Sequence, residues 1–443
     1  MVAVLLPLTL VLALAPLAEA QIFSQNRGVG GILIDADGQV DNAEVDDVGK
    51  LSRRRSAGLE PIPGVLNQTT ELRKISLSQL DQAIAEYLAQ GKDLPDAIKY
   101  LGGLQQIQYV FVYPEQNDIV LVGPGEGWDV DKRGNIVGLT TRRPVMLLDD
   151  LLVALRTARR AAQGGISCSI DPTAEGLARL RQYFSRLRGI GNPTQTAVDI
   201  ENALGPQDIT VHGVPGTSHF ARVLVAADYR MKRLAMNFEP VPIRGLPGFL
   251  TMMRSTGSRM TNMMPRWWLE PNYEPLLKSP DGLAWEFRGA SVKAMTEADF
   301  LNAAGERQRS EKANPLAQRW ADNMTEKFDE LAIAEPIFGQ LRNCMELAIV
   351  SALLVKERLP EKASFSMPTL MDSDNLKTDE FFAPKQVDSK TSMVKSGKTW
   401  IISASGGVQV NSWFVINEVE QGEAPAKART EAAPTANASW CWN

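Results

Sequence analysis

The sequence of 443 residues is poor in the side chains that most often build metal and redox centres. It contains only 2 histidines and 3 cysteines, and the cysteines lie far apart. A structural zinc site takes four ligands, chiefly from these two residue types. We therefore expect neither a bound metal nor a cofactor.

A strong excess of charge of either sign is also missing. The formal net charge is −5, and 22% of the residues are charged. Proteins that bind nucleic acid or anionic membranes usually carry a clear positive excess, so neither partner is expected. Hydrophobic residues make up 44% of the chain, which is typical of a globular protein with a packed core.

Common catalytic and phosphate-binding motifs do not occur either. The chain has no Gly-x-Ser-x-Gly elbow and no Gly-Lys-Ser/Thr at P-loop spacing. Gly123–Gly127 (GPGEG) follows an apolar strand, but a hairpin-like segment comes next and Pro124 removes one donor. A dinucleotide-binding loop would lead into a helix, so we interpret this segment as an ordinary turn.

Two aspartate-rich segments resemble the beginning of a calcium loop. In Asp129–Asn135 (DVDKRGN) the third ligand position holds Arg133, and the twelfth holds Thr140 instead of glutamate. Asp35–Gly38 (DADG) is a shorter match of the same kind. We interpret both segments as turns.

The first twenty residues predict export. Val2–Leu17 is uncharged, and Ala18-Glu19-Ala20 fits the small-x-small rule of a signal-peptidase site. The run is short for a membrane span and contains two prolines. We expect cleavage before Gln21, a periplasmic or extracellular protein, and no membrane span after cleavage.

Export would bring the three cysteines into an oxidising compartment. Cys168 lies in a strand-like run, and Cys344 lies on the apolar face of a predicted helix. Two states of Cys168 and Cys344 are therefore possible: a disulfide bridge between them, or two buried free thiols. Cys441, between two tryptophans near the end of the chain, could pair with another chain or stay a free thiol.

Hydrophobic periodicity predicts an α+β fold with a mixed β-sheet covered by helices. Asp37-Gly38 predicts a hairpin within residues 30–40, and Ser76 caps a helix over Leu77–Leu88. Strand-then-helix units follow in the middle of the chain, with Asp149, Asp171 and Ser218 as expected helix starts. The remaining predictions are a meander over residues 107–137, two long helices (Pro315–Ala334 and Pro336–Arg358) and a hairpin turning at Gly406-Gly407 within residues 400–410.

These elements divide the chain into four parts. We predict a signal peptide (1–20), an N-terminal hairpin with a polar segment (21–75), a main α+β domain (76–417) and a disordered tail (418–443). The tail is rich in Ala, Pro, Glu and Thr, which is a composition typical of disorder.

Six segments of the chain together resemble a known family. They are YLGGLQQIQYVFVYPEQNDIVLVGPGEGW, LLDDLLVALR, CSIDPTAEGLARLR, ADYRMKRLAM, MPRWWLEPNYEPL and ASGGVQV. They are similar to an exported family of planctomycete bacteria that is known only as a domain of unknown function. The resemblance extends over Leu77–Trp413 and implies an exported bacterial protein, but it supplies no catalytic residue, substrate or cofactor.

Carboxylate pairs are the chemistry that the composition best permits, because acid–base or glycoside-type work needs only two well-placed Asp or Glu side chains. Asp149 and Asp150 at a strand end, and Asp228, are the candidates. Nucleophilic hydrolysis would instead need a base beside a hydroxyl or thiol, and His219, which follows Ser218 at a predicted helix start, is the candidate for that base. Capping explains the two adjacent aspartates equally well, a lysine one helical turn away explains Asp228, and a solvated position at a helix end explains His219.

The least ordinary segment is Phe249–Tyr273 (FLTMMRSTGSRMTNMMPRWWLEPNY), which concentrates methionine, tryptophan and arginine. These residue types adapt to partners and supply much of the binding energy of interfaces. Arg266, Trp267 and Trp268 are therefore candidate binding residues, and core packing is the alternative.

Two functions follow as hypotheses. The first is a non-enzymatic binding or structural component of the cell envelope, whose partner is an unidentified envelope protein or glycan. The second is an exported hydrolase that uses carboxylates to cleave a glycan or peptide. Two carboxylates in one pocket would favour the hydrolase, and a flat Met/Trp surface would favour binding.

Overall fold

The computed structural model describes most of the chain between Val29 and Asn443. The described residues are 29–43, 46, 49–187, 191–256, 263–289, 291–301, 307–310, 315–392, 405–434 and 439–443. The expected signal peptide lies outside them, as does the first half of the hairpin predicted over residues 400–410.

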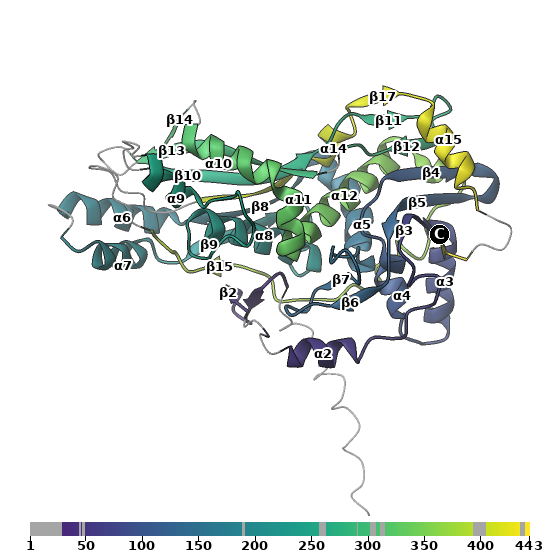
Figure 1. Cartoon of the computed structure of the whole chain (residues 1–443), viewed down its shortest axis with the longest axis horizontal. Coiled ribbons are helices and arrows are strands. Elements are labelled where there is room, and N and C mark those ends of the chain that lie inside the picture. Colours follow the sequence, from purple (N-terminus) through teal and green to yellow (C-terminus); the bar gives the residue numbers. More distant parts are fainter. Residues whose placement is uncertain are drawn as a thin grey trace, which may run out of the picture.

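Two large sheets form two sides of the molecule (Figure 1). The nine-stranded sheet runs in the order β1 (Ile32–Ile34), β2 (Gln39–Asn42), β15 (Gln386–Val387), β9 (Gln207–His212), β8 (Ile166–Pro172), β16 (Ser405–Val410), β10 (Met263–Asn272), β13 (Ser291–Leu301) and β14 (Arg307–Ser310). The seven-stranded sheet runs in the order β17 (Val419–Gln421), β11 (Leu276–Lys278), β12 (Ala284–Glu286), β4 (Tyr109–Tyr113), β5 (Asp118–Gly125), β3 (Thr70–Ser76) and β18 (Cys441–Trp442). A separate hairpin pairs β6 (Trp128–Val130) with β7 (Ile136–Gly138).

Helices pack on and between the two sheets. They are α2 (Lys50–Ser56), α3 (Leu77–Ala89), α4 (Asp96–Lys99), α5 (Leu148–Gly164), α6 (Ala174–Arg186), α7 (Pro193–Leu204), α8 (His219–Ala235), α9 (Phe249–Thr256), α10 (Pro315–Glu326), α11 (Phe328–Ala334), α12 (Pro336–Lys356), α13 (Leu359–Lys362), α14 (Ser412–Val415) and α15 (Ala424–Glu431). Short 3₁₀ turns lie at Leu101–Gly103 and Pro114–Gln116.

Both large sheets are mixed, so the predicted α+β class with a mixed sheet is confirmed. β16 pairs with β10 in parallel and with β8 in antiparallel orientation. In the other sheet β17 joins β11 in parallel, whereas β4, β5 and β3 pair in antiparallel orientation. Of the meander predicted over residues 107–137, β4 and β5 pair as expected, but β6 and β7 form the separate hairpin instead of continuing the sheet.

Helix α12 is the central element, because α5 and α8 both pack against it. It is long and apolar enough to cross a membrane, but it is completely buried within the protein, as a core helix is. It matches the second of the two long helices that we expected near the C-terminus. The first divides at Lys327 into α10 and α11.

Local signals placed several elements correctly. β1 and β2 form the expected hairpin, in which Gly38 has a φ of 87°. Ser76 Oγ accepts a hydrogen bond from Gln79 N at 3.1 Å at the start of α3. Ser218 Oγ likewise accepts from Ala221 N at 3.1 Å at the start of α8. Each of these signals acts within a few residues.

Two predicted helix starts were wrong. Helix α5 already begins at Leu148, so Asp149 and Asp150 lie in its first turn instead of capping it. Strand β8 continues through Pro172, and Thr173 is the residue that caps α6. In both places, tertiary pairing or packing extends the element beyond the local signal.

Gly406 and Gly407 do not form the expected turn, because β16 runs straight through them. A Cβ atom on Gly406 would lie 1.7 Å from Trp267 O, and one on Gly407 would lie 2.1 Å from Cys168 O. Glycine is needed here because the neighbouring strand backbones approach closely.

The segment that we expected to be disordered contains regular structure where it is described. β17 pairs with β11, α15 contacts β12, and β18 forms the edge of the sheet beside β3. Tyr113 donates a 2.7 Å hydrogen bond to Arg429 O. Composition favoured disorder, but these pairings with distant strands order the segment.

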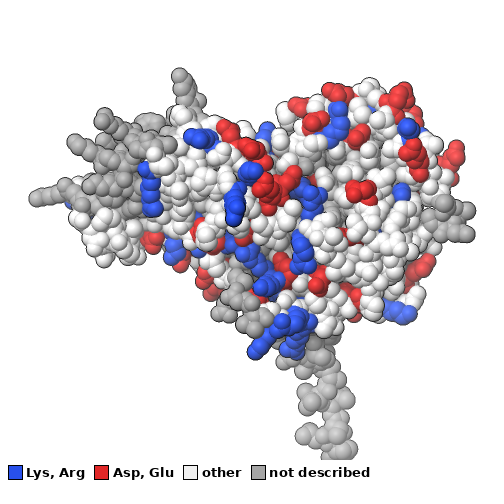
Figure 2. Space-filling view, viewed as in Figure 1, with Lys and Arg blue, Asp and Glu red and all other residues white. Residues whose placement is uncertain are grey.

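Charges of both signs are mixed over the face drawn in Figure 2. A basic cluster stands out at its lower edge, where α2 lies in Figure 1. It consists of the exposed residues Lys50, Arg53, Arg54 and Arg55. A small net charge for the whole chain is therefore compatible with a local cluster of positive charge.

Candidate functional site

A cavity of about 450 Å³ brings several of the candidate residues together. Its wall includes Asp149 from α5 and His219 from α8. Buried aliphatic side chains line it more deeply, and four exposed charged residues also contribute: Asp93, Lys99, Lys377 and Asp379. A cavity of this size is typical of small-ligand sites.

His219 and Asp150 form a close pair at this cavity. Both carboxylate oxygens of Asp150 lie 3.0 Å from His219 Nδ1. Asp150 is 4% exposed. An ionised carboxylate can only accept hydrogen bonds, so Nδ1 of His219 donates to it and carries a proton. In the neutral form of the ring, Nε2 is then the basic nitrogen. Such an orienting carboxylate is the usual support of a catalytic histidine.

Cys344 supports the same carboxylate from the central helix. Its thiol is fully buried in α12, and burial, followed by the charge of Asp150 and a hydrogen bond to it, raises the thiol pKa well above its usual value. All three cysteines are buried free thiols in the structure, so Cys168 and Cys344 are not bridged there. Of the two alternatives considered for Cys168 and Cys344, the structure has the pair of buried free thiols. Cys344 lies on the buried helix α12 as expected, and its contact with Asp150 was not predicted.

Asp149 is the second acidic group of the cavity wall. Burial, and then the nearby charge of Asp379, raise its pKa to about 6. Its Oδ2 accepts a 3.0 Å hydrogen bond from Asp379 N. A carboxyl group with a pKa near 6 can exchange a proton near neutral pH.

An irregular segment after α13 closes one side of the cavity. Besides the bond from Asp379 to Asp149, Phe381 N donates to Thr217 O at 2.8 Å. The Arg222 guanidinium lies 4.6 Å from the centre of the Phe381 ring. These contacts hold the segment against the first residues of α8.

The turn between β6 and β7 forms another part of the wall through Gly134 and Asn135. Asp131 Oδ1 accepts hydrogen bonds from Arg133 N and Asn135 N, both at 2.8 Å. This aspartate therefore organises a turn, as we interpreted it, and Arg133 points away to Glu335. In Asp35–Gly38, Asp35 Oδ1 accepts from Asp37 N and Gln39 N in the same way.

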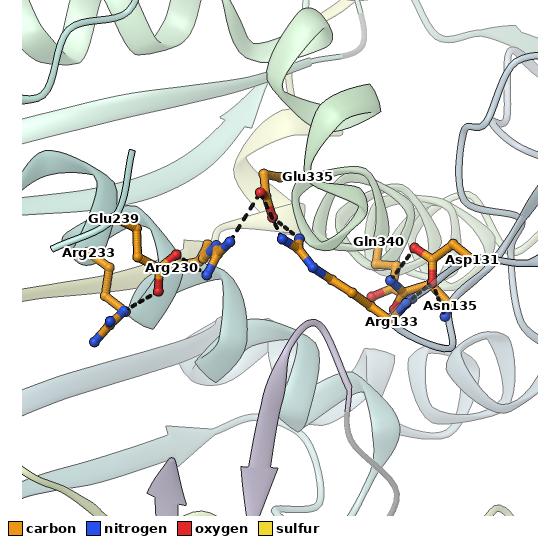
Figure 3. A network of polar contacts seen from close by, with 8 residues as sticks. All are labelled: Asp131, Arg133, Asn135, Arg230, Arg233, Glu239, Glu335 and Gln340. Atoms are coloured by element: carbon orange, nitrogen blue, oxygen red, sulfur yellow. Dashed lines mark hydrogen bonds and ion pairs between the residues drawn. The ribbon is translucent and has the colours of Figure 1, made fainter. Parts of the chain in front are cut away.

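A buried charge network fixes this turn to the helices (Figure 3). Glu335, 4% exposed, binds Arg133 through two hydrogen bonds and Arg230 through one of 3.1 Å. Glu239 in turn pairs with Arg230 and Arg233. The network joins the β6–β7 turn to α8 and to the start of α12, so it positions two sides of the cavity.

Asp228, the remaining candidate acid, lies outside the cavity. It is completely buried in α8, where its Oδ2 accepts a 2.9 Å bond from Lys232 Nζ. Burial raises its pKa to about 6, although the neighbouring charge of Lys232 acts to lower it. The lysine partner that the sequence suggested is confirmed, and the pair stands beneath the nine-stranded sheet beside Cys168.

The three binding candidates in β10 lie on two faces of the sheet. Trp267 is completely buried against Phe249 and Trp320, with ring centres 5.0 and 4.7 Å away. Arg266 and Trp268 lie on the opposite face and are partly exposed. Residues 257–262 of the Met/Trp/Arg segment lie outside the described residues.

Two residues of the cavity were missed by the sequence reasoning. Asp379 lies in a polar stretch without periodicity, and Gln340 lies on the apolar helix α12. Neither is part of a motif, and each reaches the site only through long-range packing. Within the described part of the chain, His, Cys, Asp and Glu residues form no group of three that could hold a metal ion.

Comparison with known proteins gives a family match over part of the chain and no activity. Residues 168–249 match the model of a family described as "Protein of unknown function (DUF1598)". The match includes His219 but neither Asp149 nor Asp150, and it is shorter than the resemblance over Leu77–Trp413. No curated protein and no solved structure matches the chain.

Proposed function

We propose that the protein is a hydrolase whose active centre is the cavity between α5 and α8. The observation that carries this proposal is the contact of both Asp150 oxygens with His219 Nδ1 in the cavity wall. Asp149, with its raised pKa, lies in the same wall. A base and an acid are therefore available in one concave site.

The two groups have separate roles in the proposed reaction. His219 Nε2 takes a proton from a water molecule while the water oxygen bonds to the carbon of the scissile bond, which is the carbonyl carbon of a peptide or ester and the anomeric carbon of a glycoside. Protonated Asp149 then gives its proton to the leaving atom as the scissile bond breaks. Because the pKa of Asp149 is raised to about 6, the rate should fall as the pH rises through that value.

A turnover screen tests the proposal. Fluorogenic peptides, glycosides and esters are incubated with the wild-type protein and with Asp149→Asn at pH 5 to 8. We expect turnover of one substrate class by the wild type and loss of the decline near pH 6 in the variant. Failure of every class, or an unchanged pH profile in the variant, would count against this active centre.

The alternative function, a non-enzymatic binding component of the envelope, has less support. It rested on the lack of a catalytic motif, on the Met/Trp/Arg segment and on the family resemblance. Of the three binding residues named in that segment, Trp267 packs in the core. Trp268 Nε1 donates to Glu270 Oε1 of the same strand at 2.5 Å. Packing therefore accounts for Trp267, whereas Arg266 and Trp268 are partly exposed on the other face of the sheet.

We further propose that the hydrolase is exported and acts on a peptide or glycan of the cell envelope. The support is the apolar run Val2–Leu17, which precedes Ala18-Glu19-Ala20. Intact mass spectrometry of protein from its native cells tests this. A chain that begins at Gln21 would support export, and one that retains Met1 would contradict it.

A further inference from the structure

A long irregular segment borders the cavity. Between the end of α13 and the start of β15, residues 363–385 contain no helix or strand. Irregular segments of this length are uncommon in compact domains, and those that are not disordered are usually functional, as binding loops and active-site lids are. Leu376, Lys377, Asp379 and Phe381 of this segment line the cavity.

The segment is fixed to the protein before it reaches the cavity. Asp81 Oδ1 accepts from Leu370 N at 2.7 Å and from Thr369 N at 2.9 Å. The Arg156 guanidinium donates to Leu370 O at 2.9 Å and to Asp372 O at 3.1 Å. Side chains of α3 and α5 therefore form a first anchor for the segment.

A second anchor follows the cavity. Phe381 N donates to Thr217 O at 2.8 Å, and the Arg222 guanidinium lies over the Phe381 ring. Lys385 N then donates to Gly38 O at 2.8 Å, just before β15 pairs with β2. The chain is therefore held on both sides of the stretch that lines the cavity.

Residues 373–380, between the two anchors, have few contacts with other elements. Most of them are exposed. Among the hydrogen bonds of the described residues, one joins this stretch to another element, the 3.0 Å bond from Asp379 N to Asp149 Oδ2. Leu376 is 3% exposed and lines the cavity. One hydrogen bond and one buried side chain therefore hold the stretch in place.

We propose that residues 373–380 form a lid of the cavity, with Leu376 as its apolar plug and the bond between Asp379 and Asp149 as its latch. The lid opens to admit a ligand while both anchors stay in place. Segments with few buried contacts open at a lower free energy than the core, and such lids control access to many active sites. The inference rests on the cavity as the proposed active centre and adds the part that regulates entry.

Amide hydrogen exchange of the wild-type protein tests whether the lid opens separately. The Asp379 N–H exchanges when the latch opens, whereas the N–H groups of Leu370 and Phe381 belong to the two anchors. We expect the protection factor of Asp379 to be about tenfold lower than those of Leu370 and Phe381. Equal protection of the three amides would mean that the lid opens only together with its anchors, which would overturn the inference.

The two histidines report access to the cavity. His219 lines the cavity with a side chain that is 11% exposed, whereas His212 is exposed on β9. Diethyl pyrocarbonate modifies neutral imidazole, and peptide mass spectrometry gives the ratio of the two modification rates in one sample. We expect Leu376→Ala, which removes the plug, to raise the ratio of His219 to His212 modification about tenfold. The control Leu204→Ala, at a similarly buried position in the separate cluster of α6 and α7, should leave the ratio unchanged.

A second pair of variants tests the latch. Asp379→Pro removes the backbone N–H that donates to Asp149. Asp379→Ala removes the same side chain but keeps this N–H. We expect the proline variant to raise the modification ratio about fivefold or more and the alanine variant to change it less than about twofold. Melting curves verify that each variant is folded.

A wild-type ratio in both Leu376→Ala and Asp379→Pro would overturn the lid, and so would an equal rise of the ratio in Leu204→Ala. None of these measurements needs turnover, so the lid and the hydrolase can fail separately. Lid opening without turnover of any substrate class contradicts only the hydrolase. Turnover that depends on His219, without separate opening of the lid, contradicts only the lid.

Discussion

Asp150 and His219 meet from the first turns of two different helices, with both aspartate oxygens 3.0 Å from His219 Nδ1. They are 69 positions apart in the chain. Helix α12 packs against both α5 and α8. Its Cys344 thiol is hydrogen bonded to the Asp150 carboxylate. The central helix thus sets the geometry of the pair.

Replacing the Asp150 carboxylate by an amide of the same size should disrupt the pair with His219 without leaving a cavity. Asp150→Asn can present an N–H group to Nδ1, which favours the opposite tautomer and puts the proton on Nε2. We expect turnover to fall by about 10²-fold or more. Nitrogen NMR of the imidazole should show the changed tautomer. Unchanged turnover would mean that Asp150 has only a structural role.

Asp149→Asn should stabilise the protein at neutral pH. The folded state raises the pKa of this carboxyl to about 6 from its ordinary value of 3.8, so the folded protein binds more protons between these values. Stability is therefore lost as the pH rises through this range. The amide avoids this loss and still accepts from Asp379 N.

Denaturant unfolding at two pH values measures the effect. We expect Asp149→Asn to gain about 1–2 kcal/mol at pH 7.5 and close to nothing at pH 4. An equal gain at both pH values would exclude the raised pKa as its cause. A loss at pH 7.5 would show that the ionised carboxylate is stabilising.

Removing Glu335 should be strongly destabilising. Its carboxylate is buried between Arg133 and Arg230, and Glu335→Ala leaves both guanidinium groups without it. We expect a loss of about 3–5 kcal/mol in the free energy of unfolding. The control is Glu361→Ala, whose partner Arg358 is 73% exposed, with an expected change below about 0.5 kcal/mol. Similar values for the two variants would contradict the importance of the network.

Two glycines give a matched test of strand packing. A methyl group at Gly406 would lie 1.7 Å from Trp267 O, whereas nothing lies within 4 Å of the same position at Gly64. Gly406→Ala should cost about 3 kcal/mol or more, because the backbone of β10 cannot easily move away. Gly64→Ala should change the stability by less than about 0.5 kcal/mol. Thermal unfolding compares them, and equal stabilities would show that β16 is not packed this tightly.

The sequence could predict elements with local signals, and it singled out each catalytic candidate separately. Ser76 and Ser218 cap helices through side chains three residues away from their donors. Asp149, Asp150 and His219 were recognisable as polar groups at element ends. Their common cavity was not predictable, because α12 brings them together through packing between distant segments.

The incorrect predictions also concern contacts between segments that are distant in the sequence. Trp267 was grouped with its neighbours as a binding residue, although alternation along a strand puts adjacent side chains on opposite faces. Gly406 was interpreted as a turn, because the close approach of two strands leaves no local signal. Asp379 and Gln340 carry no motif at all.

If His219 is the base of an active centre, its replacement should remove most of the activity. The other histidine, His212, is exposed on β9 and lies outside the cavity, so it serves as an internal control. The test is to measure kcat/KM for one substrate with the wild type, His219→Asn and His212→Asn. We expect a loss of about 10²-fold or more for His219→Asn and full activity for His212→Asn. Equal activities of all three proteins would contradict this role of His219.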